Sequence, residues 1–195
     1  MSSHKAEEKQ ALRRQIRQIR RSLDMGERAV MDQAVRRHLL SLPDFLEGAA
    51  KCRTVYCYVS HGNETDTQGI LAALLADGMA VAVPRVEKDH MAFYLITGPD
   101  DLTGGYKGIL EPKQGCPAAD CKAAPVLVPG SAFSGRCGRL GLGGGFYDRF
   151  MAEEPDHLWI GLAYEFQICS RLPMEEHDRP VDFVITEKQV YRKDI

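Results

Sequence analysis

Residues 138–150, GRLGLGGGFYDRF, combine clustered glycines with an arginine and an aspartate, which are residue types that can bind phosphate and a metal ion. Glycine in a helix interior costs roughly 1 kcal/mol relative to alanine, so this cluster does not serve helix stability. Glycines let backbone N–H groups approach an anion closely, and a helix that starts directly after them adds a positive dipole end. The loop alone is therefore either an anion-binding loop or a structural turn.

Two charged residues flank these glycines. Arg139 precedes the turn, where its guanidinium can make paired hydrogen bonds to phosphate oxygens. Asp148 follows at the expected helix start, where it is either a charge that complements the helix dipole or a Mg²⁺ ligand beside phosphates. The spacing matches neither the Walker loop, since no lysine follows the glycines, nor the Rossmann dinucleotide fingerprint.

The N-terminal part of the chain is expected to be helical. Residues 5–23 carry apolar side chains at helical spacing, with arginines and lysines on the other faces. Asp24 and Glu27 resemble a capping box that starts a second helix, ending near residue 40. The sequence SLPDFLEG at 41–48 then breaks this pattern with a proline and a glycine.

The rest of the chain predicts an α/β fold. A strand at 54–60, a helix at 66–78 and a strand at 79–85 form a β–α–β unit, which favours a parallel sheet. Further strands are expected at 91–96, 125–130, 158–164 and 180–186, a helix after residue 145, and an extended loop at 97–124. Ligands of such sheets bind outside the carboxyl ends of the strands.

Composition excludes several classes of function. The 195 residues carry a formal net charge of −2, so no overall basic field attracts nucleic acid. Six cysteines lack the paired spacing of a zinc site and are expected to be free thiols, as in the cytoplasm. No apolar run resembles a signal peptide or a membrane span. We therefore expect a cytoplasmic protein that binds neither membrane nor nucleic acid.

Several motifs together resemble one family. RLGLGGGFYDR closely resembles the signature of the 5-formyltetrahydrofolate cyclo-ligase family. KQALRRQIRQIRRSL is similar to the family's opening segment. VSHGNETDT is similar to a family segment that contains a glutamate, which is Glu64 in this chain. The resemblance covers about residues 9–187. Ser134 and Cys137 depart from the family pattern, which puts the course of the loop before Arg139 in doubt.

The resemblance implies a fold and an activity. The fold would be a three-layer α/β/α Rossmann-like domain with a mostly parallel sheet, of the kind found in ribose-5-phosphate isomerase and CoA-transferase-like proteins. It would span residues 1–195 as one domain, with a helical segment at 1–42 packed on an α/β core at 52–187. The activity would convert 5-formyltetrahydrofolate and ATP to 5,10-methenyltetrahydrofolate, ADP and phosphate, with Mg²⁺, through an iminium phosphate. We expect a monomer whose partners are these small molecules.

The resemblance also implies roles for individual residues. Lys9, Arg13 and Arg139 would act in catalysis, on one helix face and beside the glycine turn. Val59, Glu64 and Tyr147 would bind the folate, with Glu64 accepting hydrogen bonds from the pterin ring. Asp148 and Asp178 would ligate Mg²⁺. The ATP-binding residues would be Lys9, Gln10, Ala11, Leu12, Arg13, Arg139, Leu140, Gly141, Leu142, Gly143, Gly144, Gly145, Phe146 and Tyr147.

Three other interpretations remain open from the sequence. A phosphosugar isomerase would bind a sugar phosphate in the glycine loop without nucleotide or Mg²⁺. A folate-binding protein without turnover would keep the pocket. Nucleic-acid binding through the basic first helix would show strongly salt-dependent affinity.

Overall fold

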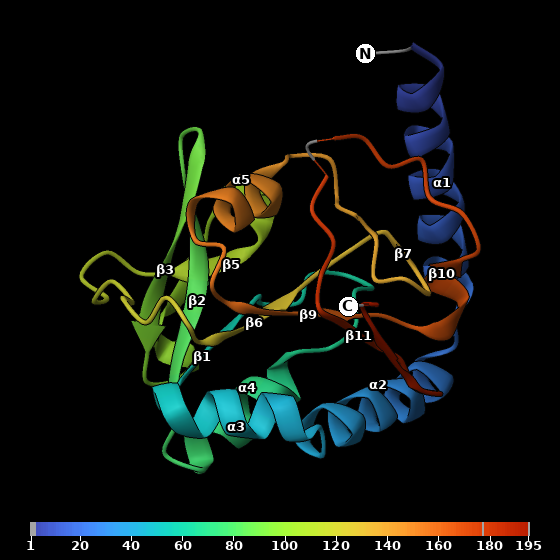
Figure 1. Ribbon diagram of the computed structural model, residues 1–195. Coiled ribbons are helices and arrows are strands. Elements are labelled where there is room, and N and C mark those ends of the chain that lie inside the picture. The colour runs from blue at the N-terminus through green and yellow to red at the C-terminus, as the bar shows by residue number, and fades with distance from the viewer. Residues whose placement is uncertain (1–2, 177, 195) are drawn as a thin grey trace.

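The computed structural model describes residues 3–176 and 178–194, in which helices cover both faces of a mostly parallel sheet (Figure 1). The helices are α1 (Ser3–Ser22), α2 (Met25–Leu40), α3 (Pro43–Cys52), α4 (Gln68–Ala76) and α5 (Phe146–Glu153). The strands of the main sheet are β1 (Thr54–Cys57), β2 (Ala80–Glu87), β3 (His90–Ile96), β6 (Pro125–Val128), β9 (Leu158–Leu162), β11 (Phe183–Ile185) and β12 (Val190–Arg192).

The main sheet confirms the predicted β–α–β unit. Its strand order is β12-β11-β9-β6-β1-β2-β3, and the five inner strands run parallel. The two edge strands, β3 and β12, run antiparallel to their neighbours. Helix α4 connects β1 to β2, whose register pairs Val55 with Val81. The carboxyl ends of β1, β6 and β9 therefore meet at one edge of the sheet.

Alternate residues of the strands face two separate apolar cores, which makes the fold three-layered as expected. One core joins Val55 and Leu127 to side chains of α2, α3 and α4. The other joins Tyr56 and Val126 to side chains of α5. Because strand side chains alternate between faces, the near-continuous apolar strands need a helical layer on each side.

The two N-terminal helices pack on different sheets of the α/β core. The buried Ile16 of α1 contacts Ala132 and Leu140, in a small sheet formed by β7 (Ala132–Ser134), β8 (Arg139–Leu140) and β10 (Ile168–Cys169). Helix α2 packs on the main sheet, in the same apolar core as α3 and α4. Figure 1 shows α1 standing beside β7 and β10, with its C-terminal end next to the start of α2.

Two segments differ from the sequence-based expectation. Residues 43–52 form a helix although they contain Pro43 and Gly48. Pro43 occupies the first turn, where its missing N–H is no loss, and a Cβ at Gly48 would lie 3.0 Å from Pro125, so the glycine permits close packing. The expected loop at 97–124 contains a two-stranded sheet, β4 (Leu102–Gly104) and β5 (Leu110–Pro112).

The predicted second helix begins as expected. The Asp24 side chain accepts hydrogen bonds from the backbone N–H groups of Gly26 and Glu27, at 2.7 and 3.3 Å.

Within residues 3–176 and 178–194, no helix combines the length and the apolar character needed to cross a membrane.

Candidate active site

A cavity of about 580 Å³ opens at the carboxyl ends of the parallel strands. Tyr58 and Val59 follow β1, Pro129 follows β6, and Pro84 and Val86 lie in the second half of β2. This is the position at which open parallel sheets bind ligands. The prediction that the site lies at this edge of the sheet agrees with where the cavity is found.

The other walls come from three segments far apart in the sequence. Helix α1 contributes Arg17, Arg20 and Arg21; the turn around β5 contributes Tyr106 to Glu111; and the loop that starts at Arg139 contributes Gly141 to Asp148. Apolar side chains such as Met91 and Phe146 share these walls with charged side chains, including the three arginines of α1. A cavity of this kind suits a flat, partly apolar ligand with a polar edge.

The three residues expected to bind the folate all line this cavity. Val59 is buried, and Glu64 and Tyr147 are half-buried. Burial raises the pKa of Glu64, while the backbone N–H of His61, 2.9 Å from the carboxylate, and the charge of Arg20 oppose that rise. Burial raises the pKa of Tyr147 well above its ordinary value, so this residue is a neutral phenol at physiological pH.

The glycine loop is followed by α5, as the sequence predicted, but it begins at β8, a strand in the segment that was expected to be a loop. Gly143 and Gly145 have φ angles of +111° and +68°, which other residues adopt only with strain. Gly145 caps α5, which begins at Phe146. A Cβ at Gly141 would lie 3.1 Å from the guanidinium of Arg139. At these three positions, backbone conformation or packing accounts for glycine.

Arg139 lies beneath this loop rather than on its surface. Its side chain is only 2% exposed, and its guanidinium donates to the carbonyl of Pro129 at 3.2 Å and to Asp148 at 2.8 Å. Its Nε has no hydrogen-bond partner in the structure. The guanidinium also lies over the ring of Tyr147, 5.6 Å from the centroid. Arg139 thus connects the end of β6 to the first turn of α5.

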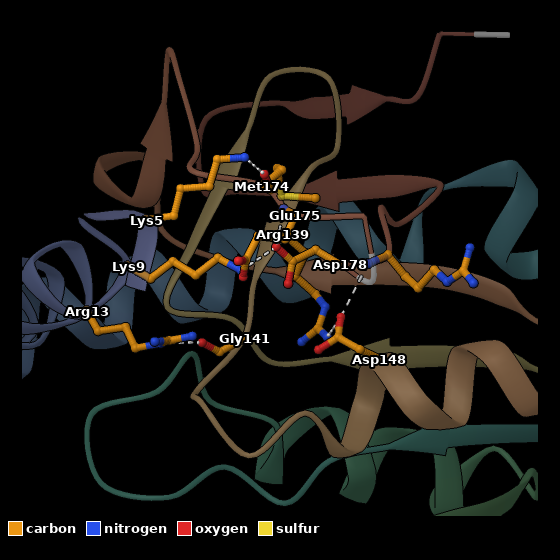
Figure 2. A network of polar contacts seen from close by, with 10 residues as sticks. Lys5, Lys9, Arg13, Arg139, Gly141, Asp148, Met174, Glu175 and Asp178 are labelled. Carbon is orange, nitrogen blue, oxygen red and sulfur yellow. Dashed lines mark hydrogen bonds and ion pairs between the residues drawn. The ribbon is translucent and has the colours of Figure 1, made fainter. Parts of the chain in front are cut away.

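Lys9 and Arg13 extend from one face of α1 toward the other parts of the site (Figure 2). Lys9 is 6% exposed and donates to Glu175 at 2.6 Å and to Asp178 at 2.5 Å. Burial lowers the pKa of Lys9, but the two carboxylates raise it by more, so it stays above the ordinary value. Arg13 Nε donates to the carbonyl of Gly141 at 2.9 Å.

The two aspartates expected to bind Mg²⁺ lie in neighbouring segments. The backbone N–H of Arg179 donates to Asp148 at 3.3 Å, which brings the segment containing Asp178 to the start of α5. In the structure as described, Asp148 binds Arg139 and Asp178 binds Lys9 (Figure 2). Among residues 3–176 and 178–194, no group of three His, Cys, Asp or Glu side chains forms an all-protein metal site.

This donor set suits Mg²⁺ bound together with phosphate. Mg²⁺ takes hard oxygen ligands and is usually held by one or two carboxylates, with waters and substrate phosphates completing its coordination. Asp148 and Asp178 are two carboxylates of this kind, and the cations Lys9, Arg13 and Arg139 beside them suit an anionic ligand.

The residues expected at the site differ in burial. Gln10 and Ala11 are exposed on α1, whereas their neighbour Lys9 is buried. The departures Ser134 and Cys137 close a tight turn between β7 and β8: Ser134 accepts a hydrogen bond from the N–H of Gly138 at 3.0 Å, and Cys137 has a φ of +60°. This turn places Arg139 in β8, antiparallel to β7.

Sequence reasoning missed several residues that the fold brings to the site. Arg20 is buried against the cavity, and its only signal was its spacing of four residues from the buried Ile16. Tyr106 and Lys107 line the cavity from the segment that was expected to be an extended loop, with no signal of function. Glu175 shares Lys9 with Asp178, and only the fold reveals it.

Comparison with known proteins supports the resemblance over nearly the whole chain. The family model described as the 5-formyltetrahydrofolate cyclo-ligase family matches residues 5–187. The 5-formyltetrahydrofolate cyclo-ligase of Saccharomyces cerevisiae is 31% identical over 208 residues, which cover 91% of this chain and 94% of the yeast protein.

Two solved structures have the same fold. The NMR structure of Aquifex aeolicus 5,10-methenyltetrahydrofolate synthetase superposes with a TM-score of 0.81 at 34% identity, covering 94% of this chain and 92% of that one. The 5,10-methenyltetrahydrofolate synthetase of Mycoplasma pneumoniae superposes with a TM-score of 0.72 at 25% identity, covering 92% and 98%.

Proposed function

The chain belongs to the 5-formyltetrahydrofolate cyclo-ligase family, and we propose that it uses ATP and Mg²⁺ to close the ring of 5-formyltetrahydrofolate. It is an enzyme of folate metabolism with methenyltetrahydrofolate synthetase activity. The products of the proposed reaction are 5,10-methenyltetrahydrofolate, ADP and phosphate.

The chemistry explains why ATP is needed. The formyl oxygen of an amide-like group is a poor leaving group, so ring closure requires its activation. Transfer of the γ-phosphoryl group from ATP to this oxygen breaks the bond to ADP and forms an iminium phosphate. Nitrogen 10 then attacks the former formyl carbon, and the C–O bond breaks as phosphate leaves. The protein's task is to position two reactants and to stabilise charge.

The single observation that carries this proposal is the position of the glycine loop between two different environments. Toward the cavity, Gly141 and Gly144 form one wall with Glu64 and Tyr147. Toward α1, Gly141 accepts a hydrogen bond from Arg13. A flat ring in the cavity and phosphates at the loop would therefore lie next to each other, as phosphoryl transfer requires.

The roles proposed for the residues are those that the resemblance implies, and this arrangement supports them. Glu64 would accept hydrogen bonds from the amino and N–H groups of the pterin, with Val59 and Tyr147 as apolar contacts. Lys9 and Arg13 would exchange their present partners for the nucleotide phosphates. Arg139 would stabilise the transferring phosphoryl group only if its bond to Asp148 opened. The remaining loop residues would contribute backbone N–H groups.

Asp148 and Asp178 would hold Mg²⁺. The ion would supply electrostatic stabilisation of the phosphate oxygens during transfer. If Asp148 and Asp178 held the ion, Arg139 would lose its carboxylate partner and Lys9 would keep Glu175, which would leave both cations able to bind phosphate oxygens. Metal ligation by Asp148 and Asp178 would thus be coupled to phosphate binding by Arg139 and Lys9.

The test follows the absorbance of the methenyl product after mixing purified protein with 5-formyltetrahydrofolate. A rise that requires both ATP and Mg²⁺ supports the proposal. Binding of the folate without a rise would contradict it and indicate a folate-binding protein without turnover. Absence of folate binding, with affinity for a sugar phosphate instead, would indicate a phosphosugar enzyme.

A further inference from the structure

Arg20 is a buried cation that the roles above do not use. It is 9% exposed, lies on α1 and lines the cavity together with Glu64 and Tyr58. Its Nη2 donates to the carbonyl of Gly130 at 2.6 Å, whereas its Nε has no hydrogen-bond partner. No carboxylate forms an ion pair with it in the described part of the chain. Burying such a guanidinium is costly.

The Gly130 carbonyl fixes where this charge lies. Gly130 also accepts a hydrogen bond from the side chain of Gln167 at 3.1 Å, and Gln167 is fully buried. The acceptor is therefore held rigidly in the loop that follows β6. As a result, the guanidinium of Arg20 is anchored at the cavity wall and does not turn toward solvent.

The charged group that acts most strongly on Arg20 is the carboxylate of Glu64. Among the groups that act on Arg20, Glu64 is the strongest attraction, and Arg20 in turn favours the ionised form of Glu64. The other groups that face Glu64 are His61 on its own loop, Tyr58 after β1 and Tyr147 of α5. Arg17, Arg21, Lys107, Glu111, Arg139 and Asp148 also line the cavity, but among the described residues the cations that act on Glu64 are Arg20 and His61.

We propose that Arg20 is a positioning residue of the folate site, whose anchored positive charge keeps the Glu64 carboxylate ionised inside the cavity. Only the ionised carboxylate accepts hydrogen bonds with both oxygens from a pair of N–H donors, such as those at the edge of a pterin ring. A protonated carboxyl presents an O–H to that edge and loses one acceptor. This inference rests on the proposed function, because it takes the folate as the ligand of Glu64.

The experiment measures the dissociation constant of 5-formyltetrahydrofolate by calorimetry, without ATP, from about pH 6 to about pH 8.5. Arg20→Gln removes the charge but keeps a donor for the Gly130 carbonyl, and Arg20→Lys keeps the charge. Arg14→Met removes an exposed arginine of the same helix that does not line the cavity. All proteins carry His61→Gln, so that this imidazole contributes no pH dependence.

The expected results differ between the variants. Loss of the positive charge raises the pKa of Glu64, so binding to Arg20→Gln weakens as pH falls, by roughly tenfold per unit below that pKa. At the alkaline end its affinity approaches that of the parent. Arg20→Lys and Arg14→Met keep the parent profile. In the Glu64→Gln background, Arg20→Gln adds no pH dependence, because the group through which Arg20 acts is gone.

Several outcomes would overturn the inference. Equal weakening at every pH would mean that Arg20 holds the fold or contacts the folate directly. An affinity that is unchanged at every pH would mean that Arg20 neither holds the fold, nor contacts the folate, nor acts on Glu64. If Arg20→Gln does not fold, the parent protein decides: affinity that already falls below about pH 7 would show that Glu64 is not kept ionised. Failure of the parent to bind folate at any pH would instead reject the proposed function.

Discussion

The guanidinium of Arg139 lies 2.8 Å from a carboxylate oxygen of Asp148, so the cation expected to bind phosphate and the carboxylate expected to bind Mg²⁺ bind each other. Arg139 is 2% exposed at its side chain and Asp148 16%. In the ligand-free site, the charges of these two residues therefore neutralise each other. Binding of phosphate to Arg139 and of a metal ion to Asp148 would have to separate the two residues.

Arg139→Met tests this relationship. Loss of one partner of a buried ion pair leaves the other uncompensated, so we expect the free energy of unfolding to fall by about 3 kcal/mol, measured by urea denaturation. We expect kcat/KM to fall roughly ten- to hundredfold. Arg136→Met, which removes an exposed arginine three residues earlier, is the matched control. Equal stability of the two variants would disprove the structural role of the pair.

Gly143→Ala tests the backbone of the glycine loop. The φ angle of +111° is unfavourable for alanine, so the substitution should lower the free energy of unfolding by about 1–3 kcal/mol. Gly104→Ala is the control, because no atom lies within 4 Å of its added Cβ, and it should change stability by less than about 0.5 kcal/mol. A Gly143→Ala variant as stable as Gly104→Ala would show that the loop adopts another conformation.

Lys9→Met tests the contact between α1 and the segment at 174–178. We expect it to lower the free energy of unfolding at neutral pH by roughly 2–4 kcal/mol, because two charge-assisted hydrogen bonds are lost. The folded-state pKa of Lys9 is raised above 10.5, so this contribution is fully present below pH 10.5 and disappears as pH rises through the folded-state pKa. The difference between wild type and Lys9→Met should therefore shrink in alkaline solution. A difference that persists unchanged there would contradict the assigned ion pairs.

Arg13→Met tests whether α1 takes part in nucleotide binding. Arg13 binds the glycine loop through the Gly141 carbonyl, so its loss should raise the KM for ATP by about tenfold, the value of one charge-assisted contact. Its exposed neighbour Arg14 is the control, and Arg14→Met should leave the KM for ATP unchanged. Identical steady-state kinetics of the two variants would exclude Arg13 from the nucleotide site.

Local patterns predicted much of the fold and part of the site. The β–α–β unit, the helix that follows the glycines and the cap at Asp24 depend on neighbouring residues and were predicted correctly. Val59, Glu64 and Tyr147, which the resemblance named as folate-binding residues, line one cavity, and their role in binding stays a prediction. The helix at 43–52 was missed because a proline in the first turn does not break a helix and tertiary packing overrides the low propensity of glycine.

The sequence by itself determined the residue types, the central β–α–β unit and the resemblance to one family, because all of these are properties of short segments and their succession. Only the tertiary structure decided which charges meet. Lys9 and Asp178 are 169 residues apart, and Arg20 reaches the Gly130 carbonyl over 110 residues. The energy of such contacts depends on distance and burial in three dimensions, and neither is encoded in the spacing along the chain.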